Sequence, residues 1–220
     1  MPGQSDDRYR VLQQSVFGAL PEVELRRLAE EAHESRLRAG HIVYDAEVSI
    51  VAAGFMRAYI AAGDGRQVTF AYGRTGDTLA LAHLAGRRYP TAFQAITDSR
   101  LVIVGNDLTR ELYASHPALG WAMTQELAAR LDDFQRELAY FAFGSLRQRL
   151  AYHLLALTAA SNDFSSQPIH LAHLANAVGT SREMVSRTLA PLAANGILHT
   201  DTAGVVVTDR RRLQDEANVD

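Results

Sequence analysis

The spacing of apolar residues divides the sequence into stretches of different periodicity. Residues 13–33 carry apolar positions at helical spacing, with Pro21 at a first-turn position, and this pattern predicts a short N-terminal helical element. Residues 42–104 change to short alternating or β-branched runs interrupted by glycine, and Asp64-Gly65 between two such runs indicates a hairpin. The second stretch therefore predicts an antiparallel barrel or sandwich.

Apolar side chains then repeat with heptad spacing over residues 117–143, which predicts a long helix with one apolar seam. Such a seam can face its own domain or a second copy of the chain. The strand-rich region before the helix and the helical region after it favour self-association, so we expect a homodimer. The predicted dimer interface consists of Leu127, Leu131, Phe134, Leu138 and Phe141.

Residues 171–192 predict two short helices joined by a tight turn. Apolar positions at i, i+3, i+4 and i+7 form the first helix, Gly179 permits a positive φ, and Ser181 is a suitable N-cap for the second helix. The following ILHTDTAGVVVTD predicts two strands around a turn at Gly204, which would form a wing. The second helix turns its apolar residues inward, and its outward face carries Arg182, Glu183, Ser186 and Arg187.

This outward face carries groups that can read DNA bases. Arginine can donate two hydrogen bonds to guanine, a carboxylate can accept from cytosine N4, and serine can bond to a base or a phosphate. The residues fall in the first two turns, where a recognition helix enters the major groove. A solvated face with an ordinary Arg/Glu pair is the alternative, and the turn, the cap and the wing together favour DNA binding.

Composition by itself counts against nucleic acid as a partner. The formal net charge is -3, and all 22 basic residues are arginine, so DNA contact must come from local placement. The absence of cysteine excludes disulfides and thiolate metal sites, and the sequence contains no metal-ligand cluster, phosphate loop or nucleophile motif of an enzyme. No apolar run approaches the roughly 18 residues of a membrane span, so we expect a cytoplasmic protein without membrane attachment.

Three segments together resemble the C-terminal winged helix-turn-helix domain of the Crp/Fnr family of transcription regulators: AFGSLRQRLAYHLLAL, LANAVGTSREMVSRTLAPLAANGIL and VVVTD. The preceding strands and seam helix resemble that family's sensor barrel and dimerisation helix. The resemblance implies an α+β fold with a jelly-roll-like antiparallel barrel over residues 1–116, a dimerisation helix over 117–143 and a winged helix-turn-helix over 144–220. It also implies double-stranded DNA, a second copy of the chain and RNA polymerase as partners.

Within SREMVSR, the resemblance implies that Arg182, Glu183 and Arg187 read bases, with Ser181 and Ser186 beside them. An arginine directly before the glutamate resembles the cyclic-AMP receptor branch, which implies a palindromic site with TGTGA-like half-sites about one helical turn apart. We expect a kink or an early end of this helix at Pro191, because proline removes a backbone hydrogen bond.

The predicted effector pocket departs from the family pattern. Cyclic-nucleotide binders in the family carry Gly-Glu-Leu for the ribose and Arg-Ser-Ala for the phosphate, whereas Leu81 stands here at the glutamate position and Pro90 at the arginine position. A buried phosphate without a cation is costly, so we expect that cyclic AMP is not the effector. Arg87 and Arg88 lie close by, and a shifted alignment would bring in one of them. The candidate pocket residues are Leu81, Arg88, Thr91, Ala92 and Phe134.

The effector and any cofactor stay open at this point. His33, His41 and His83 lie in the sensor half and could ligate haem, as some relatives do. The barrel could also have lost ligand binding. The alternative function is a haem or small-ligand sensor module that signals through a protein partner.

Overall fold

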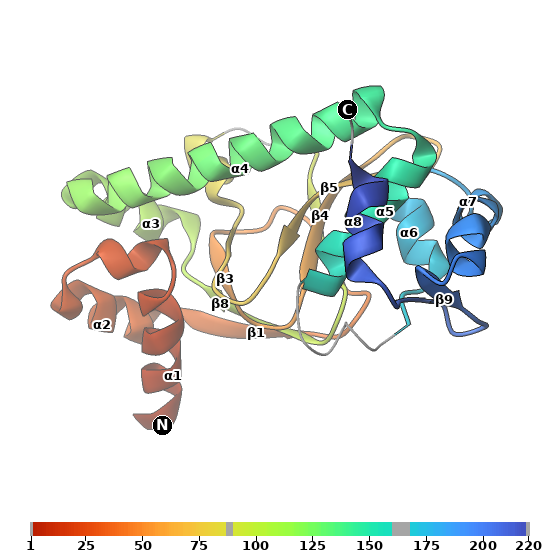
Figure 1. Cartoon of the computed structure of the whole chain (residues 1–220). Coiled ribbons are helices and arrows are strands. Elements are labelled where there is room, and N and C mark those ends of the chain that lie inside the picture. Colours follow the sequence, from red (N-terminus) through yellow and green to blue (C-terminus); the bar gives the residue numbers. More distant parts are fainter. Residues whose placement is uncertain (1, 87–89, 160–167, 219–220) are drawn as a thin grey trace. The chain divides into compact units, whose positions relative to one another are not determined.

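A computed structural model describes residues 2–86, 90–159 and 168–218 of the chain (Figure 1). The chain forms two compact units, one from the described residues of 1–58 and 71–133, the other from those of 59–70 and 134–220. The fold is of the predicted α+β class, with N-terminal antiparallel sheets, a long helix and a C-terminal helix-turn-helix.

Within the described residues ahead of the long helix, eight strands form two four-stranded sheets, with orders β1-β8-β3-β6 and β2-β7-β4-β5. β1 pairs antiparallel with β8, β3 with β6 and β8, and β2 with β7. This confirms the antiparallel strand region predicted from the sequence. The strands are β1 (His33–Leu37), β2 (Ile42–Val43), β3 (Ser49–Ala53), β4 (Met56–Ala61), β5 (Gln67–Gly73), β6 (Thr78–Leu79), β7 (Ala92–Ala95) and β8 (Ser99–Ile103), with the 3₁₀ helix η2 (Leu81–Ala85) before β7.

The predicted hairpin joins β4 and β5. The N–H of Ala62 donates to the carbonyl of Arg66 over 2.8 Å, and Gly65 adopts a φ of 85° that favours glycine. The carboxylate of Asp64 accepts a hydrogen bond from the backbone N–H of Arg66, which lowers the pKa of that carboxyl. The hairpin predicted from Asp64-Gly65 is therefore present between β4 and β5.

The N-terminal region contains more helix than the sequence predicted. It comprises α1 (Pro2–Gln13), η1 (Val16–Ala19) and α2 (Glu22–Glu31) instead of one element over 13–33. A Cβ on Gly18 would lie 2.2 Å from the carbonyl oxygen of Gln13, so only glycine fits this tight connection. Apolar side chains of these helices form one core with strands β3 and β8 and the first turns of the long helix, among them Leu12, Phe17, Leu28, Ile50, Val102 and Leu119.

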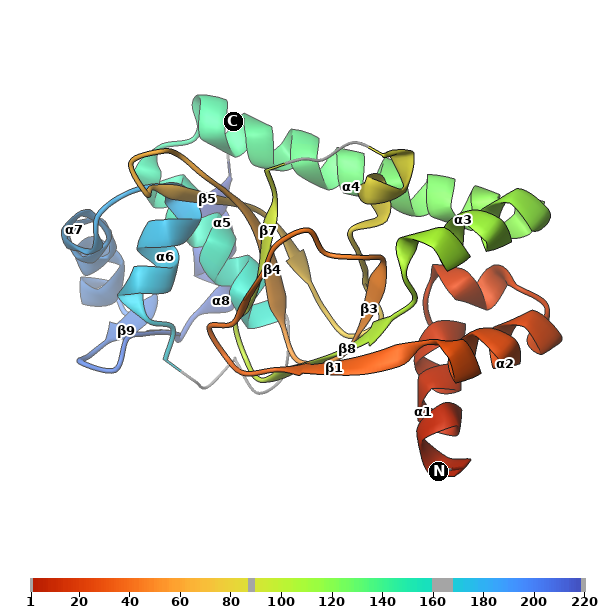
Figure 2. The ribbon, with the colours of Figure 1, turned by 180° about the vertical axis from the view of Figure 1, so that it is seen from behind.

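Helix α3 (Asn106–Ser115) precedes the long helix α4 (Pro117–Phe143), whose bounds are those predicted from the heptad pattern. Figure 2, which views the ribbon from behind, shows α3 beside the first turns of α4. The early α4 residues Leu119 and Met123 belong to the apolar core, which anchors that end of the helix.

The C-terminal region contains α5 (Leu146–Ala159), α6 (Leu171–Val178), α7 (Arg182–Ala194), β9 (Leu198–Thr200), β10 (Val205–Val207) and α8 (Arg210–Ala217). The predicted short strand at Ile169 is a single bridge to Val205. The core of this C-terminal region is apolar. Its side chains with 0% exposure are Leu150, Leu154, Leu174, Val185, Leu189, Leu192 and Leu213. Helix α8 was not predicted, and Leu213 is its contribution to this core.

Helix α7 runs through Pro191 and ends at Ala194, so the early end expected at this proline is not seen. The N–H of Asn195 donates to the Pro191 carbonyl over 3.1 Å, which carries the helical pattern past the proline. Proline removes only its own N–H, so the helix loses the one bond to the Arg187 carbonyl and continues to Ala194.

Candidate nucleic-acid interface

The turn between α6 and α7 has the geometry that its sequence predicts. Gly179 adopts a left-handed φ of 68° and caps α6, and the N–H of Thr180 donates to the carbonyl of Ala175 over 2.9 Å. Ser181 is extended, and its hydroxyl oxygen accepts a 3.2 Å hydrogen bond from the N–H of Met184. The turn therefore fixes where α7 begins (Figure 2).

The buried face of α7 holds the helix against α6. Val185, Leu189 and Leu192 are fully buried, and Ala175 of α6 has 3% exposure. Because alanine is small, it lets the two helix backbones approach closely. The direction in which α7 presents its other face is therefore set by packing rather than by a mobile loop.

The opposite face of α7 is polar and exposed at Ser181, Arg182, Glu183, Ser186 and Arg187. The guanidinium of Arg187 donates to the Glu183 carboxylate over 2.8 Å, with side-chain exposures of 69% and 77%. A pair this exposed contributes at most about 1 kcal/mol, so both groups can exchange partners with little loss. The face can therefore present a donor fork and an acceptor to a ligand.

The strands β9 and β10 form the predicted wing. They pair antiparallel, with Val206 opposite His199, and the Asp201 carboxylate closes the turn by accepting hydrogen bonds from the N–H groups of Ala203 and Gly204. A Cβ on Gly204 would lie 2.4 Å from the carbonyl oxygen of Ile169, so glycine is required there. His199 and Asp201 are exposed, with 3.7 Å between His199 Nε2 and an Asp201 oxygen.

A buried acid–base pair joins the last turns of α4 to α5. Nε2 of His153 lies 3.1 Å from Oε1 of Glu137, and the two side chains are 1% and 6% exposed. The contact does not meet hydrogen-bond geometry, and Oε1 of Glu137 accepts no hydrogen bond from the described residues. Beside it, Tyr140 packs on Tyr152 with 4.3 Å between ring centroids, and burial raises the pKa of the Tyr140 phenol.

The predicted seam of α4 is largely solvent-exposed in the single chain. The exposed fractions are 42% for Leu127, 55% for Leu131, 46% for Phe134 and 55% for Leu138. Phe141 is half-buried, with the Arg149 guanidinium 5.4 Å from its ring centroid. Four large apolar side chains at heptad spacing are thus about half exposed.

The predicted effector residues have different environments. Leu81 is buried in the apolar core with the N-terminal helices, Ala92 is buried on β7, and Thr91 is half-buried. The ring of Phe134 meets that of Phe70 edge-on at 6.3 Å. Arg88 lies outside the described residues. Leu81, which the sequence alignment places at the family's glutamate position, is therefore a buried apolar group.

The three histidines considered for haem show no shared arrangement. Nδ1 of His83 lies 2.9 Å from the Ala46 carbonyl oxygen, while His33 and His41 are exposed. Within the described ranges, no cluster of three or more His, Asp or Glu side chains could hold a metal ion. Nor does any described helix have the length and apolarity needed to cross a membrane.

The chain is similar to known transcription regulators over most of its length. Residues 148–216 match the Crp-like helix-turn-helix domain. The transcriptional regulator LdrP of Thermus thermophilus is 30% identical over 169 residues, which cover 74% of this chain and 84% of that protein. The cyclic AMP receptor protein of the same species is 30% identical over 170 residues, covering 76% and 78%. A CRP/FNR-family transcriptional regulator, also from T. thermophilus, has a similar fold, with a TM-score of 0.68, 22% identity and coverage of 84% and 98%.

Proposed function

The chain belongs to the Crp/Fnr family of transcription regulators, and from this premise we propose that it is a homodimer that reads a palindromic, TGTGA-like DNA site with α7. The observation that carries the proposal is the exposed face of the first two turns of α7. Arg182, Glu183, Ser186 and Arg187 stand there on a helix whose start is fixed by the Gly179 turn and the Ser181 cap.

The chemistry of this face suits the proposed half-site. In TGTGA each guanine offers O6 and N7 to an arginine fork, and the cytosine opposite each guanine offers its N4 amino group to a carboxylate. Arg187 and Glu183 are already 2.8 Å apart, so they can engage neighbouring base pairs without a change in the helix. Arg182 has no ion pair or hydrogen bond among the described residues and is available for a second base or a phosphate.

The proposed dimer forms through the seam of α4. Burying four half-exposed apolar side chains per copy against a twin helix follows the heptad geometry of a two-stranded coiled coil. A two-fold axis between the helices would present two copies of α7, which matches a palindromic site. We assign residues 1–116 to sensing, 117–143 to dimerisation and 144–220 to DNA binding, with RNA polymerase as a further partner.

We also propose that the sensor region does not respond to cyclic AMP, although one relative is a cyclic AMP receptor protein. Leu81 and Pro90 replace the acidic and basic groups that the family uses for the nucleotide, and Leu81 is packed in the core. An anionic phosphate would lack its cation there. The effector, if one exists, has another chemistry.

Competition binding tests the proposed site. A labelled duplex with two TGTGA half-sites one helical turn apart is challenged with unlabelled TGTGA or TTGAT duplexes of equal length. We expect the TGTGA duplex to compete at a concentration at least tenfold lower. Equal competition by both duplexes, or a preference for TTGAT, would contradict the proposal.

A further inference from the structure

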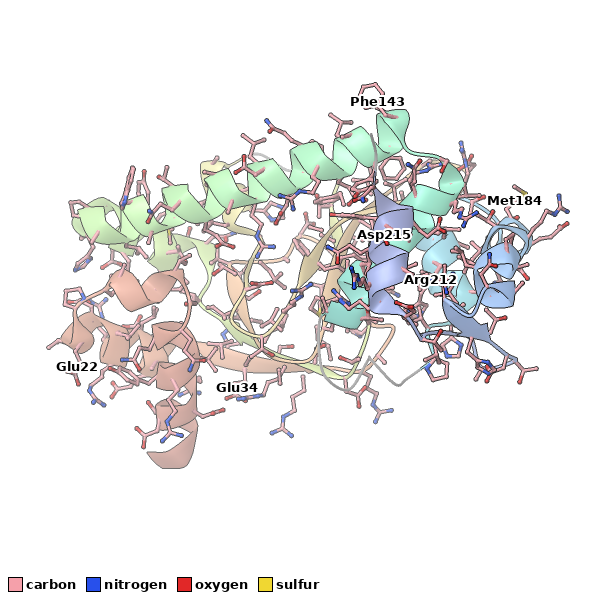
Figure 3. All side chains as sticks on the ribbon, in the orientation of Figure 1. Glu22, Glu34, Phe143, Met184, Arg212 and Asp215 are labelled. Atoms are coloured by element: carbon pink, nitrogen blue, oxygen red, sulfur yellow. The ribbon has the colours of Figure 1, made fainter. Side chains whose placement is uncertain are left out.

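Helix α7 exposes one large apolar side chain on the same turns as its charged groups. Met184 is 39% exposed, whereas Val185, Leu189 and Leu192 of the same helix are fully buried. Figure 3 shows its side chain pointing away from α7. This side chain is only partly buried, so it leaves apolar surface in solvent beside the arginine and glutamate side chains.

The position of Met184 along the helix is fixed by two hydrogen bonds. Its N–H donates to the Ser181 hydroxyl in the first turn, and its carbonyl accepts a 2.7 Å hydrogen bond from the Thr188 hydroxyl. It follows Glu183 directly and precedes Arg187 by three residues, so it lies on the flank of the face that carries this pair. Any surface that the Glu183–Arg187 pair contacts is therefore within reach of the flexible Met184 side chain.

The surroundings argue against a protein partner at this methionine. Over the described residues 168–218, Met184 is the only exposed large apolar side chain. A stable protein interface buries about 800 Å² on each partner around an apolar centre, and one methionine flanked by charges does not supply this. A ligand with a single small apolar group among polar edges fits better.

The major groove of DNA has this composition. Base edges there offer hydrogen-bond donors and acceptors, and their one apolar group is the C5-methyl of thymine. The thioether of methionine is polarisable and adapts to irregular apolar contacts. We propose that Met184 contacts a thymine methyl group and is a further specificity-determining residue, an inference that rests on the proposed DNA-reading function of α7.

The test removes the methyl group and nothing else. Each thymine of the TGTGA duplex, on both strands, is replaced in turn by deoxyuridine, and binding is measured by fluorescence anisotropy. If competition shows that TGTGA is not preferred, a site selected from a randomised duplex pool takes its place. At one symmetric thymine position we expect affinity to fall about fourfold per half-site, which corresponds to about 0.8 kcal/mol for one buried carbon.

Three variants of Met184 assign the effect to the side chain. Met184→Ala and Met184→Gln should bind the thymine and deoxyuridine duplexes equally at that position, whereas Met184→Leu should keep at least half of the discrimination. Helical circular dichroism shows that each variant is folded. Ala190→Ser, which changes an exposed side chain further along the same helix, should leave the discrimination unchanged.

The outcomes separate this inference from the function on which it depends. Three results would overturn the role of Met184 without contradicting the proposed function. These are specific binding without any thymine preference, a selected site without thymine, and a thymine preference that survives in Met184→Ala. Failure to bind any duplex in preference to random DNA would instead overturn the proposed function.

Discussion

Replacing His153 by alanine tests how the last turns of α4 are held to α5. The substitution leaves the Glu137 carboxylate buried at 6% exposure, and no described group replaces the lost imidazole. For a protonated imidazole 3.1 Å from the carboxylate, and an effective dielectric constant of about 20, the Coulomb attraction is about 5 kcal/mol. Breaking a buried pair on one side typically costs about 3–5 kcal/mol, so we expect a loss within that range.

Urea unfolding at pH 7, followed by helical circular dichroism, measures this loss. The midpoint should fall while the slope stays constant, because the surface exposed on unfolding is unchanged. The double variant Glu137→Leu with His153→Leu should recover most of the stability, since it leaves no buried charge. His199→Ala is the matched control, because its contact with Asp201 is exposed and should contribute less than about 0.5 kcal/mol. A loss in His153→Ala no larger than in His199→Ala would refute the reasoning.

Three further predictions concern the seam, the helix cap and the sensor. Leu131 is 55% exposed in the single chain, so Leu131→Ala removes about 1 kcal/mol of burial from each copy at the dimer interface. Because both copies lose this contribution, the dimer dissociation constant measured by sedimentation velocity should rise about 30-fold. Val23 is exposed on α2, and Val23→Ala should leave the dimer dissociation constant unchanged. If Val23→Ala and Leu131→Ala changed this constant equally, the interface would not be at the seam. Ser181→Ala should lower the free energy of unfolding by about 1 kcal/mol through loss of the cap on Met184, and an unchanged urea midpoint would mean that the cap contributes nothing. Cyclic AMP at millimolar concentration should give no binding heat in calorimetry, and a saturable heat would contradict the proposed loss of the nucleotide site.

The elements that could be predicted from the sequence are those specified by local chemistry. The seam helix has a continuous heptad pattern, and its observed bounds match those predicted. The α6–α7 turn depends on one glycine and one serine cap, and the wing on Gly204, all within a few residues of the elements they join. In each case the determinant lies next to the structure that it determines.

The elements that were missed depend on contacts distant in sequence or on weak apolar patterns. Helix α8 reads RRRLQDEA and buries only Leu213 and Ala217, so its sequence alone resembles an exposed segment. Helix α1 is similarly polar. Both gain their stability from packing on other elements, which a local pattern does not reveal.

The Glu137–His153 pair was also missed, although a signal for it exists. His153 lies three residues after Leu150 and four before Leu157, and therefore in the buried stripe of α5. Glu137 falls between Phe134 and Phe141 at spacings of three and four. A charged group on an apolar stripe indicates a buried partner, but the partner's identity depends on how two helices cross.

The central claim, that the first two turns of α7 read bases, is tested most directly by the base preference of Arg187→Ala. Binding of the wild type and the variant is compared on the TGTGA duplex and on duplexes changed at one base pair at a time. We expect specific affinity to fall by about 1–3 kcal/mol, with the preference lost at one base pair per half-site and kept at the others. A variant that keeps the wild-type affinity and the wild-type preference at every position would contradict the account.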